Sequence, residues 1–147
     1  MVTLNKLSKS ELMGRVRTKN TKPELIVRKK LFALNLRYRV NVKELPGKPD
    51  IVFKSRKKVI FVNGCFWHQH TCKKGTLPKS NIAFWKDKLN GNVKRDKDNY
   101  LKLMNDNWQI RVLWECKITG TDFVELKDWV LGHKNQSTNL VQMATVE

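Results

Sequence analysis

The segment FVNGCFWHQHTC holds residues of the types that bind metal ions. Cys65, His70 and Cys72 have the spacing C-x4-H-x-C, and Cys116 follows a predicted strand further along the chain. Three thiolates and one imidazole match a closed tetrahedral zinc site, which leaves no position for water and is therefore structural. The alternative is that small buried cysteines lie near an unrelated histidine. The spacing permits His68 in place of His70, so one of the two histidines remains as a candidate proton carrier.

Oxygen ligands form a second candidate site. Asp50 begins a strand directly after LPGKP, and Val62 lies at the end of the returning strand of the same hairpin. A carboxylate, a backbone carbonyl and waters suit Mg²⁺, and we group Glu24 with these residues. Beside a DNA phosphate, Mg²⁺ would promote phosphodiester hydrolysis as a Lewis acid. The alternative is that Asp50, which follows a proline, only caps a turn or strand.

Three aromatic residues stand among polar and basic neighbours rather than in apolar runs: Phe66, Trp67 and Trp85. Large apolar side chains near a polyanion site can wedge between base steps and deform a duplex. Equally, they could cover the metal loop or fill the core.

The charge of the chain predicts a polyanionic partner. Its 147 residues include 30 Lys and Arg against 13 Asp and Glu, a net charge of +17. Nucleic acid is the usual partner of such a surface, although a ribosome-like RNA binder or a solvated basic face would have the same composition. Charge supplies affinity without specificity, so it does not identify a substrate.

We expect a cytoplasmic protein without membrane contact. The apolar runs are too short to span a bilayer, and the N-terminus lacks the apolar core of a signal peptide. The chain has three cysteines. Because this number is odd and the compartment is reducing, a disulfide framework is not expected.

Capping residues and periodicity predict the elements that position these groups. A helix from about Lys22 to Leu34 begins with the capping-box pair Thr21 and Glu24, and a last helix from about 122 to 131 ends at Gly132. The alternating segment RYRVNV predicts a strand, DIVF and VIFV predict a buried β-hairpin, and QIRVLWEC predicts a further strand. One mixed sheet flanked by helices fits this order.

A second helix is expected to begin after Ser80 or Asn81. Its predicted inward-facing residues are Phe84, Leu89, Val93, Tyr100 and Met104. The chain, residues 1–147, suits a single domain. Within it we expect an N-terminal arm over 1–11 and a flexible tail over 134–147.

Five blocks of the sequence resemble the very short patch repair (Vsr) mismatch endonucleases. They are GRVRTKNTKPE, RYRVNVKELPGKPDIVF, VIFVNGCFWHQHTC, AFWKDKLNGNVKRDKDN and NWQIRVLWEC followed by TG. They occur in the family's order over about residues 12 to 120, and GCFWH, with PGKPD before it and WEC after it, is their most specific part.

The resemblance implies an α/β, restriction-endonuclease-like fold of the PD-(D/E)xK type with a structural zinc site. It implies a Mg²⁺-dependent endonuclease that nicks one strand of double-stranded DNA 5′ to the thymine of a T:G mismatch. Such mismatches arise when 5-methylcytosine deaminates, so a DNA cytosine methyltransferase is the implied functional companion. The enzyme would act as a monomer at the nucleoid of a prokaryotic cytoplasm.

The resemblance also assigns roles to single residues. Asp50 matches the catalytic Mg²⁺-binding aspartate, Val62 the carbonyl position of the same site and Glu24 a helix acid that supports it. His68 falls on a histidine that acts in proton transfer. Two larger sets follow: the zinc ligands are Cys65, His70, Cys72 and Cys116, and the aromatics that intercalate beside the mismatch are Phe66, Trp67 and Trp85.

Asn63 departs from the family pattern, which usually has histidine immediately before GC. An amide can bind a phosphate or position a water, but it cannot shuttle a proton near neutral pH. We expect retained activity that depends on His68. The alternatives are a nickase associated with restriction–modification, a structure-specific nuclease, or a catalytically impaired, zinc-stapled DNA-binding module.

Overall fold

The computed structural model describes residues 20–133, so the predicted arm over 1–11 and tail over 134–147 lie outside the described residues. The elements are α2 (Lys22–Ala33), β1 (Arg39–Val40), β2 (Ile51–Phe53), β3 (Lys58–Asn63), α3 (Ile82–Asn105), β4 (Gln109–Trp114) and α4 (Phe123–Leu131), with short 3₁₀ turns at Lys54–Arg56, Lys73–Gly75 and Glu115–Gly120. None of the helices within 20–133 could cross a membrane.

The four strands form one mixed sheet in the order β1-β2-β3-β4, as predicted. β1 pairs with β2 and β2 with β3 in antiparallel fashion, whereas β3 and β4 are parallel, with Asn63 opposite Trp114. α3 supplies the long crossover that a parallel pair requires. Because β3 and β4 end at the same edge of the sheet, the segments that follow them meet there.

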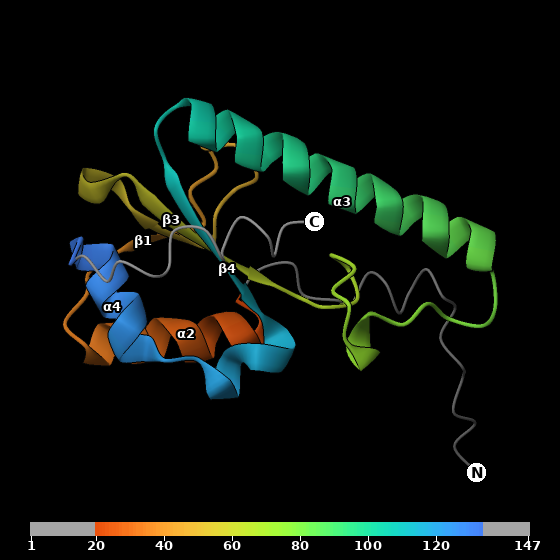
Figure 1. Cartoon of the computed structure of the whole chain (residues 1–147), viewed down its shortest axis with the longest axis horizontal. Coiled ribbons are helices and arrows are strands. Elements are labelled where there is room, and N and C mark those ends of the chain that lie inside the picture. Colours follow the sequence, from red (N-terminus) through yellow and green to blue (C-terminus); the bar gives the residue numbers. More distant parts are fainter. Residues whose placement is uncertain (1–19, 134–147) are drawn as a thin grey trace, which may run out of the picture.

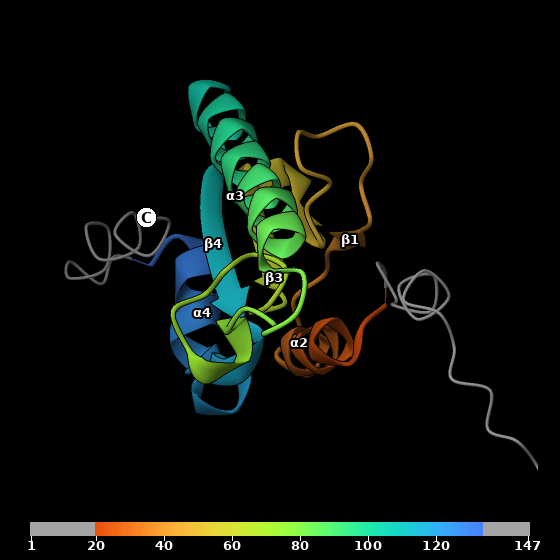
Figure 2. The same cartoon turned by 90° about the vertical axis from the view of Figure 1, so that its right-hand side faces the viewer.

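Helices cover both faces of the sheet (Figures 1 and 2), with α2 and α4 on one face and α3 on the other. Successive residues of β3 point to opposite faces. Ile60 packs with the residues of α2 and α4, whereas Val59 and Phe61 pack with Tyr100 and Leu103 of α3. β3 is therefore buried on both sides, which explains its continuous apolar sequence.

The predicted caps of the first and last helices are confirmed. The Thr21 hydroxyl accepts a hydrogen bond from the Glu24 backbone N–H at the start of α2, which ends one residue before the predicted Leu34. At the start of α4 the Asp122 carboxylate accepts from two backbone N–H groups. Gly132 ends α4 with φ of 78°, a conformation that glycine adopts without steric cost.

Two predictions about the intervening elements are confirmed in part: a strand forms in RYRVNV, and Leu89 and Tyr100 of α3 are buried as predicted. The strand in RYRVNV is limited to two residues, because Asn41 has a φ of 51° that ends the extended conformation. Along α3, Phe84 is 56% exposed and Met104 is 36% exposed, while Leu103 is buried. The first turns of this long helix extend beyond the sheet (Figure 1), so they have no core to face.

Candidate active site and metal centre

A cavity of about 790 Å³ lies where α2, the β2–β3 hairpin and α3 approach one another. Carboxylates, basic side chains and one histidine line it: Glu24, Asp50, Asp96, Glu115, Lys43, Lys48, Lys88 and His68. Val62, Asn63 and Trp67 also contribute to its wall. The cavity thus gathers most of the residues that the sequence suggested for Mg²⁺ binding and proton transfer.

Asp50 is fixed by the neighbouring strand. Its Oδ2 accepts a hydrogen bond of 2.7 Å from the backbone N–H of Val62. The pKa of Asp50 is raised to about 7, mainly by burial and also by the Glu24 carboxylate, against the opposing effects of the Val62 N–H, Arg28 and His68. We expected Val62 to contribute its carbonyl to a metal site; the contact that the structure shows is made by its N–H.

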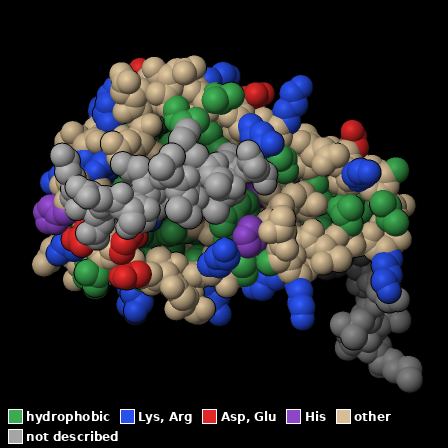
Figure 3. All heavy atoms as spheres, in the orientation of Figure 1, with side chains coloured by type: hydrophobic (Ala, Val, Ile, Leu, Met, Phe, Trp, Pro, Cys, Tyr) green, Lys and Arg blue, Asp and Glu red, His purple; other side chains and the backbone are tan. Residues whose placement is uncertain are grey.

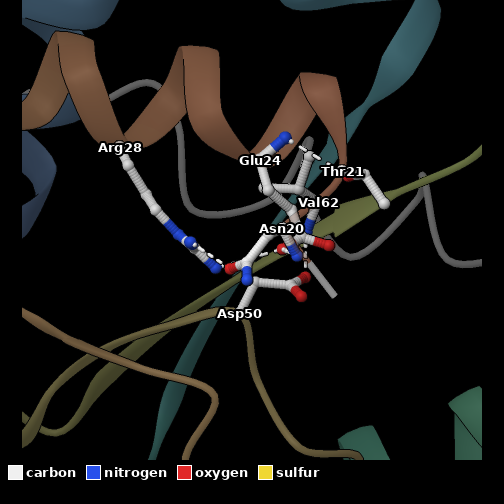
Figure 4. A network of polar contacts seen from close by, with 6 residues as sticks. All are labelled: Asn20, Thr21, Glu24, Arg28, Asp50 and Val62. Atoms are coloured by element: carbon white, nitrogen blue, oxygen red, sulfur yellow. Dashed lines mark hydrogen bonds and ion pairs between the residues drawn. The ribbon is translucent and has the colours of Figure 1, made fainter. Parts of the chain in front are cut away.

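Glu24 lies beside Asp50 and is only 3% exposed. Its Oε2 accepts two hydrogen bonds, one of 3.0 Å from the Asn20 backbone N–H and one of 3.1 Å from Arg28 Nη2. Figure 4 shows these side chains converging from α2 and the segment before it on Asp50. Two carboxylates and one guanidinium therefore share a small, poorly solvated space.

His68 lines the cavity and is not part of the cysteine cluster. Its Nδ1 lies 2.5 Å from Asp96 Oδ2 on α3, so Nε2 is the nitrogen left for chemistry. Sequence reasoning missed Asp96, which stands in the run KRDKDN among basic residues. The sequence shows only that Asp96 is an acidic residue in a basic helix segment. Its partner, His68, lies in the loop after β3 and is identified only when α3 packs over that loop.

Asn63 is held inside the protein at the end of β3. Its side chain is buried, and Nδ2 donates a 3.1 Å hydrogen bond to the hydroxyl of Tyr100. Burial raises the pKa of Tyr100, so this hydroxyl stays protonated and Asn63 has a neutral partner. Asn63 lines the same cavity as Asp50 and His68.

The four predicted zinc ligands come together at the ends of β3 and β4. One ligand atom from each of Cys65, His70, Cys72 and Cys116 lies within 4.8 Å of the others. Cys116 Sγ is 3.4 Å from His70 Nδ1, and the His70 ring stacks on Trp114 at 4.4 Å. This distribution of thiols and imidazole fits a tetrahedral zinc ion.

The loop between the ligands is tightly folded. His70 N donates to Cys65 O at 2.9 Å, and Gln69 Nε2 donates to Phe66 O and to Gly75 O at 2.8 and 3.3 Å. A Cβ atom on Gly75 would lie 1.9 Å from the His70 carbonyl oxygen. Only glycine fits there, so the loop depends on this residue.

Four aromatic side chains form one cluster beside the cavity: Phe66, Trp67, Phe84 and Trp85. Their ring centroids are separated by 5.1 Å for Phe66–Trp67, 5.5 Å for Phe66–Trp85, 6.1 Å for Trp67–Trp85 and 5.3 Å for Phe84–Trp85. Hydrophobic side chains gather on the surface at the end of the molecule where α3 begins (Figure 3), with Lys and Arg side chains distributed around them. Sequence reasoning included three of the four residues but assigned Phe84 to the core.

Comparisons with known proteins identify related nucleases. The family model of the DNA mismatch endonuclease Vsr matches residues 1–74. The chain is 46% identical to the type II nicking enzyme V.NmeAIP of Neisseria meningitidis over 75% of this chain and 79% of the relative. It is 44% identical to the type II nicking enzyme V.XorIIP of Xanthomonas oryzae pv. oryzae, over 79% and 85% of the two chains.

A third relative, the DNA mismatch endonuclease Vsr of Escherichia coli, is 32% identical over 87% of this chain and 86% of its own. These proteins are nucleases by name, and the matches cover 75–87% of this chain. The chain belongs to the Vsr family of DNA mismatch endonucleases.

Proposed function

We propose that the protein is a Mg²⁺-dependent, restriction-endonuclease-like enzyme that nicks one strand of duplex DNA 5′ to the thymine of a T:G mismatch. The observation that carries the proposal is that one cavity contains the buried Glu24 carboxylate, the partly buried Asp50 carboxylate, a histidine paired with a further carboxylate and the edge of the aromatic cluster. Such a site combines groups for cation binding, for proton transfer and for base contact.

Asp50 and Glu24 would hold the catalytic Mg²⁺, and we keep the Val62 carbonyl as a further ligand. The donor set fits, because hard oxygen ligands suit Mg²⁺ and because a dication relieves the repulsion between two neighbouring carboxylates, which contributes to the raised pKa of Asp50. When bound, Mg²⁺ would supply Lewis-acid stabilisation of charge on the scissile phosphate. The Val62 N–H orients Asp50 for this role.

His68 would carry the proton that moves during hydrolysis. Asp96 accepts a hydrogen bond from Nδ1, which fixes the ring and leaves Nε2 toward the cavity. Asn63, at the position where the family usually has a second histidine, is tied to Tyr100 and cannot take up a proton. The geometry thus supports proton transfer by one histidine, with Asn63 as a neutral part of the wall.

Cys65, His70, Cys72 and Cys116 would hold a structural Zn²⁺. Four protein ligands fill a tetrahedral coordination shell and leave no position for water. Burial raises the pKa of the Cys65 thiol to about 12, so metal binding must displace its proton. The ion would join the loop after β3 to the end of β4, and thereby hold His68 and the aromatic cluster beside the cavity.

The aromatic cluster and the basic surface would bind the DNA. Phe66, Trp67 and Trp85 would intercalate beside the mismatch, with unstacking offset by contacts to the deformed duplex. The net charge of +17 supports contacts to the phosphates. We further propose a monomer that works in the cytoplasm, where the DNA is, alongside a DNA cytosine methyltransferase that generates 5-methylcytosine.

A second candidate function is that of a nickase associated with a restriction–modification system. It is favoured by the names of two relatives with 44% and 46% identity, which are type II nicking enzymes. The catalytic residues would be the same, and the difference would lie in whether a mismatch is needed for cleavage.

A nicking assay tests the proposal. End-labelled duplexes that differ only in one T:G or C:G pair are incubated with protein and Mg²⁺, with Asp50→Ala as the control. Scission of the thymine strand alone, lost in the variant, is the expected result. Equal cutting of both duplexes would favour the restriction-associated nickase, and binding without Mg²⁺-dependent cutting would favour a DNA-binding module without catalysis.

A further inference from the structure

Arg28 is a charged residue beside the candidate active site to which neither the sequence nor the proposed function assigns a role. It lies one helical turn after Glu24 in α2, and its side chain is only 13% exposed. Nη2 donates to Glu24 Oε2 at 3.1 Å and Nη1 donates to Asn20 Oδ1 at 2.7 Å. One end of the guanidinium is therefore engaged by a carboxylate at the cavity and the other by the exposed Asn20 side chain (Figure 4).

These contacts determine how the Glu24 carboxylate is oriented. Oε2 accepts from both Arg28 and the Asn20 backbone N–H, at 3.1 and 3.0 Å. Oε1 receives neither of these hydrogen bonds, so it is the oxygen that remains for a ligand in the cavity. Arg28 also donates to the Asn20 side chain, so it fixes the residue whose backbone N–H is the second donor to Oε2.

An ordinary surface ion pair does not explain this arrangement. Glu–Arg pairs one turn apart on exposed helices contribute little to stability and tolerate many orientations. Here Glu24 is 3% exposed and lines the cavity next to Asp50. A planar fork that donates in fixed directions gives such a buried carboxylate one orientation, which the single ammonium of lysine cannot do.

We propose that Arg28 is a positioning residue for the cleavage reaction, which holds the Glu24 carboxylate with Oε1 directed to the metal site that it shares with Asp50. The inference rests on the proposed metal-dependent function. It assigns Arg28 no contact with DNA.

Cation binding in the absence of DNA tests the inference without relying on activity. The probe is Mn²⁺, which accepts the same oxygen ligands as Mg²⁺, and free Mn²⁺ is measured by electron paramagnetic resonance in Zn²⁺-saturated protein. Arg28→Met should weaken Mn²⁺ binding at least tenfold, and Arg28→Lys should weaken it by less. Because Arg28 lowers the pKa of Asp50, loss of its charge alone would also weaken Mn²⁺ binding near neutral pH, so Arg28→Lys is the deciding variant. If Arg28 acted by its charge alone, Arg28→Lys would bind Mn²⁺ as tightly as the wild type. Wild-type affinity in Arg28→Lys, or unchanged or tighter binding by Arg28→Met, overturns the inference.

Two further variants separate positioning from folding. Tyr38→Phe is the matched control, because the Tyr38 hydroxyl donates to the Arg28 carbonyl oxygen at 2.8 Å without touching the guanidinium; it should lower the melting temperature and leave Mn²⁺ affinity unchanged. In a Glu24→Gln background, adding Arg28→Met should change Mn²⁺ affinity by less than threefold, since Arg28 would act through Glu24. A full tenfold loss in that background would refute the inference.

The outcomes also distinguish this inference from the proposed function. Wild-type protein that neither binds Mn²⁺ in the cavity nor nicks DNA with Mg²⁺ would remove both. Wild-type protein that binds and nicks, while both Arg28 variants behave identically to it, would remove only the role of Arg28. If Arg28→Met fails to fold, the Mn²⁺ affinity of Arg28→Lys tests the inference, because lysine keeps the positive charge and lacks the planar guanidinium.

Discussion

The buried Asp50 carboxylate should make the stability of the metal-free protein depend on pH. Burial raises its pKa from the ordinary value of 3.8 to about 7. Between these two values the unfolded chain has lost the Asp50 proton and the folded protein has kept it, so the free energy of unfolding falls as the pH rises. A shift of about 3 units corresponds to about 4 kcal/mol at most, at about 1.36 kcal/mol per unit.

Asp50→Asn removes this dependence. Asparagine does not ionise, and its side-chain oxygen can accept the same hydrogen bond from the Val62 N–H. The difference in the free energy of unfolding between the variant and the wild type should therefore grow, in favour of the variant, by about 2–3 kcal/mol from pH 5 to pH 8. This range covers about two of the three pH units over which folded and unfolded Asp50 differ in protonation. An active site that needs an ionised buried carboxylate is expected to cost stability in this way.

Urea unfolding followed by tryptophan fluorescence at pH 5 and pH 8, without added Mg²⁺, measures this difference. Mg²⁺ added at pH 8 should restore stability to the wild type and not to Asp50→Asn, because only the wild type binds it through this carboxylate. Asp98→Asn, which removes an exposed carboxylate from α3, is the control and should match the wild type at both pH values. Parallel pH dependences of wild type and Asp50→Asn would refute the reasoning.

Three further predictions follow from the site. His68→Ala should lower the single-turnover cleavage rate by about 10²–10⁴-fold while DNA binding is retained. Asp96→Asn should lower the same rate by less. A pH–rate profile unaffected by His68→Ala would contradict the assigned proton transfer. Gly75→Ala should lower both the bound zinc, measured by atomic absorption, and the melting temperature, since the new Cβ would lie 1.9 Å from the His70 carbonyl oxygen; full zinc content would contradict the tight loop. Trp85→Ala should reduce the preference for T:G over C:G duplexes more than it reduces total affinity, as measured by competition binding; an equal loss for both duplexes would assign the aromatic cluster to general affinity.

Local signals in the sequence predicted much of the fold. The Thr21 cap, the alternating or continuous apolar strands and Gly132 act over a few residues, so α2, the β2–β3 hairpin and α4 could be located directly. The inward face of α3 could be located only in part: Leu89 and Tyr100 are buried as predicted, whereas apolar residues at the start of the helix belong to a surface cluster. Helical periodicity identifies Phe84 as an apolar position but does not distinguish a core position from one in a surface cluster.

The candidate site was predicted in part. Spacing alone left His68 and His70 as equal candidates for the metal; in the structure His70 joins the cysteines and His68 faces Asp96. Asp96 was missed because its partner lies on a distant segment of the chain. The contact between Glu24 and Arg28, by contrast, could be predicted from the sequence, because residues four apart on a helix are neighbours. The burial of this pair could not be predicted.

The parallel pairing of β3 with β4 gives the cysteine cluster a part in folding itself. Cys65 and Cys72 are close in the chain, whereas Cys116 reaches them only after β4 has aligned with Asn63 opposite Trp114. A strand that slipped by one residue would turn its side chains to the opposite faces and carry Cys116 away from its partners. A metal ion bound at this cluster would therefore stabilise the correct register of β3 and β4 over a shifted one. Only the correct register brings Cys116 to the other three ligands.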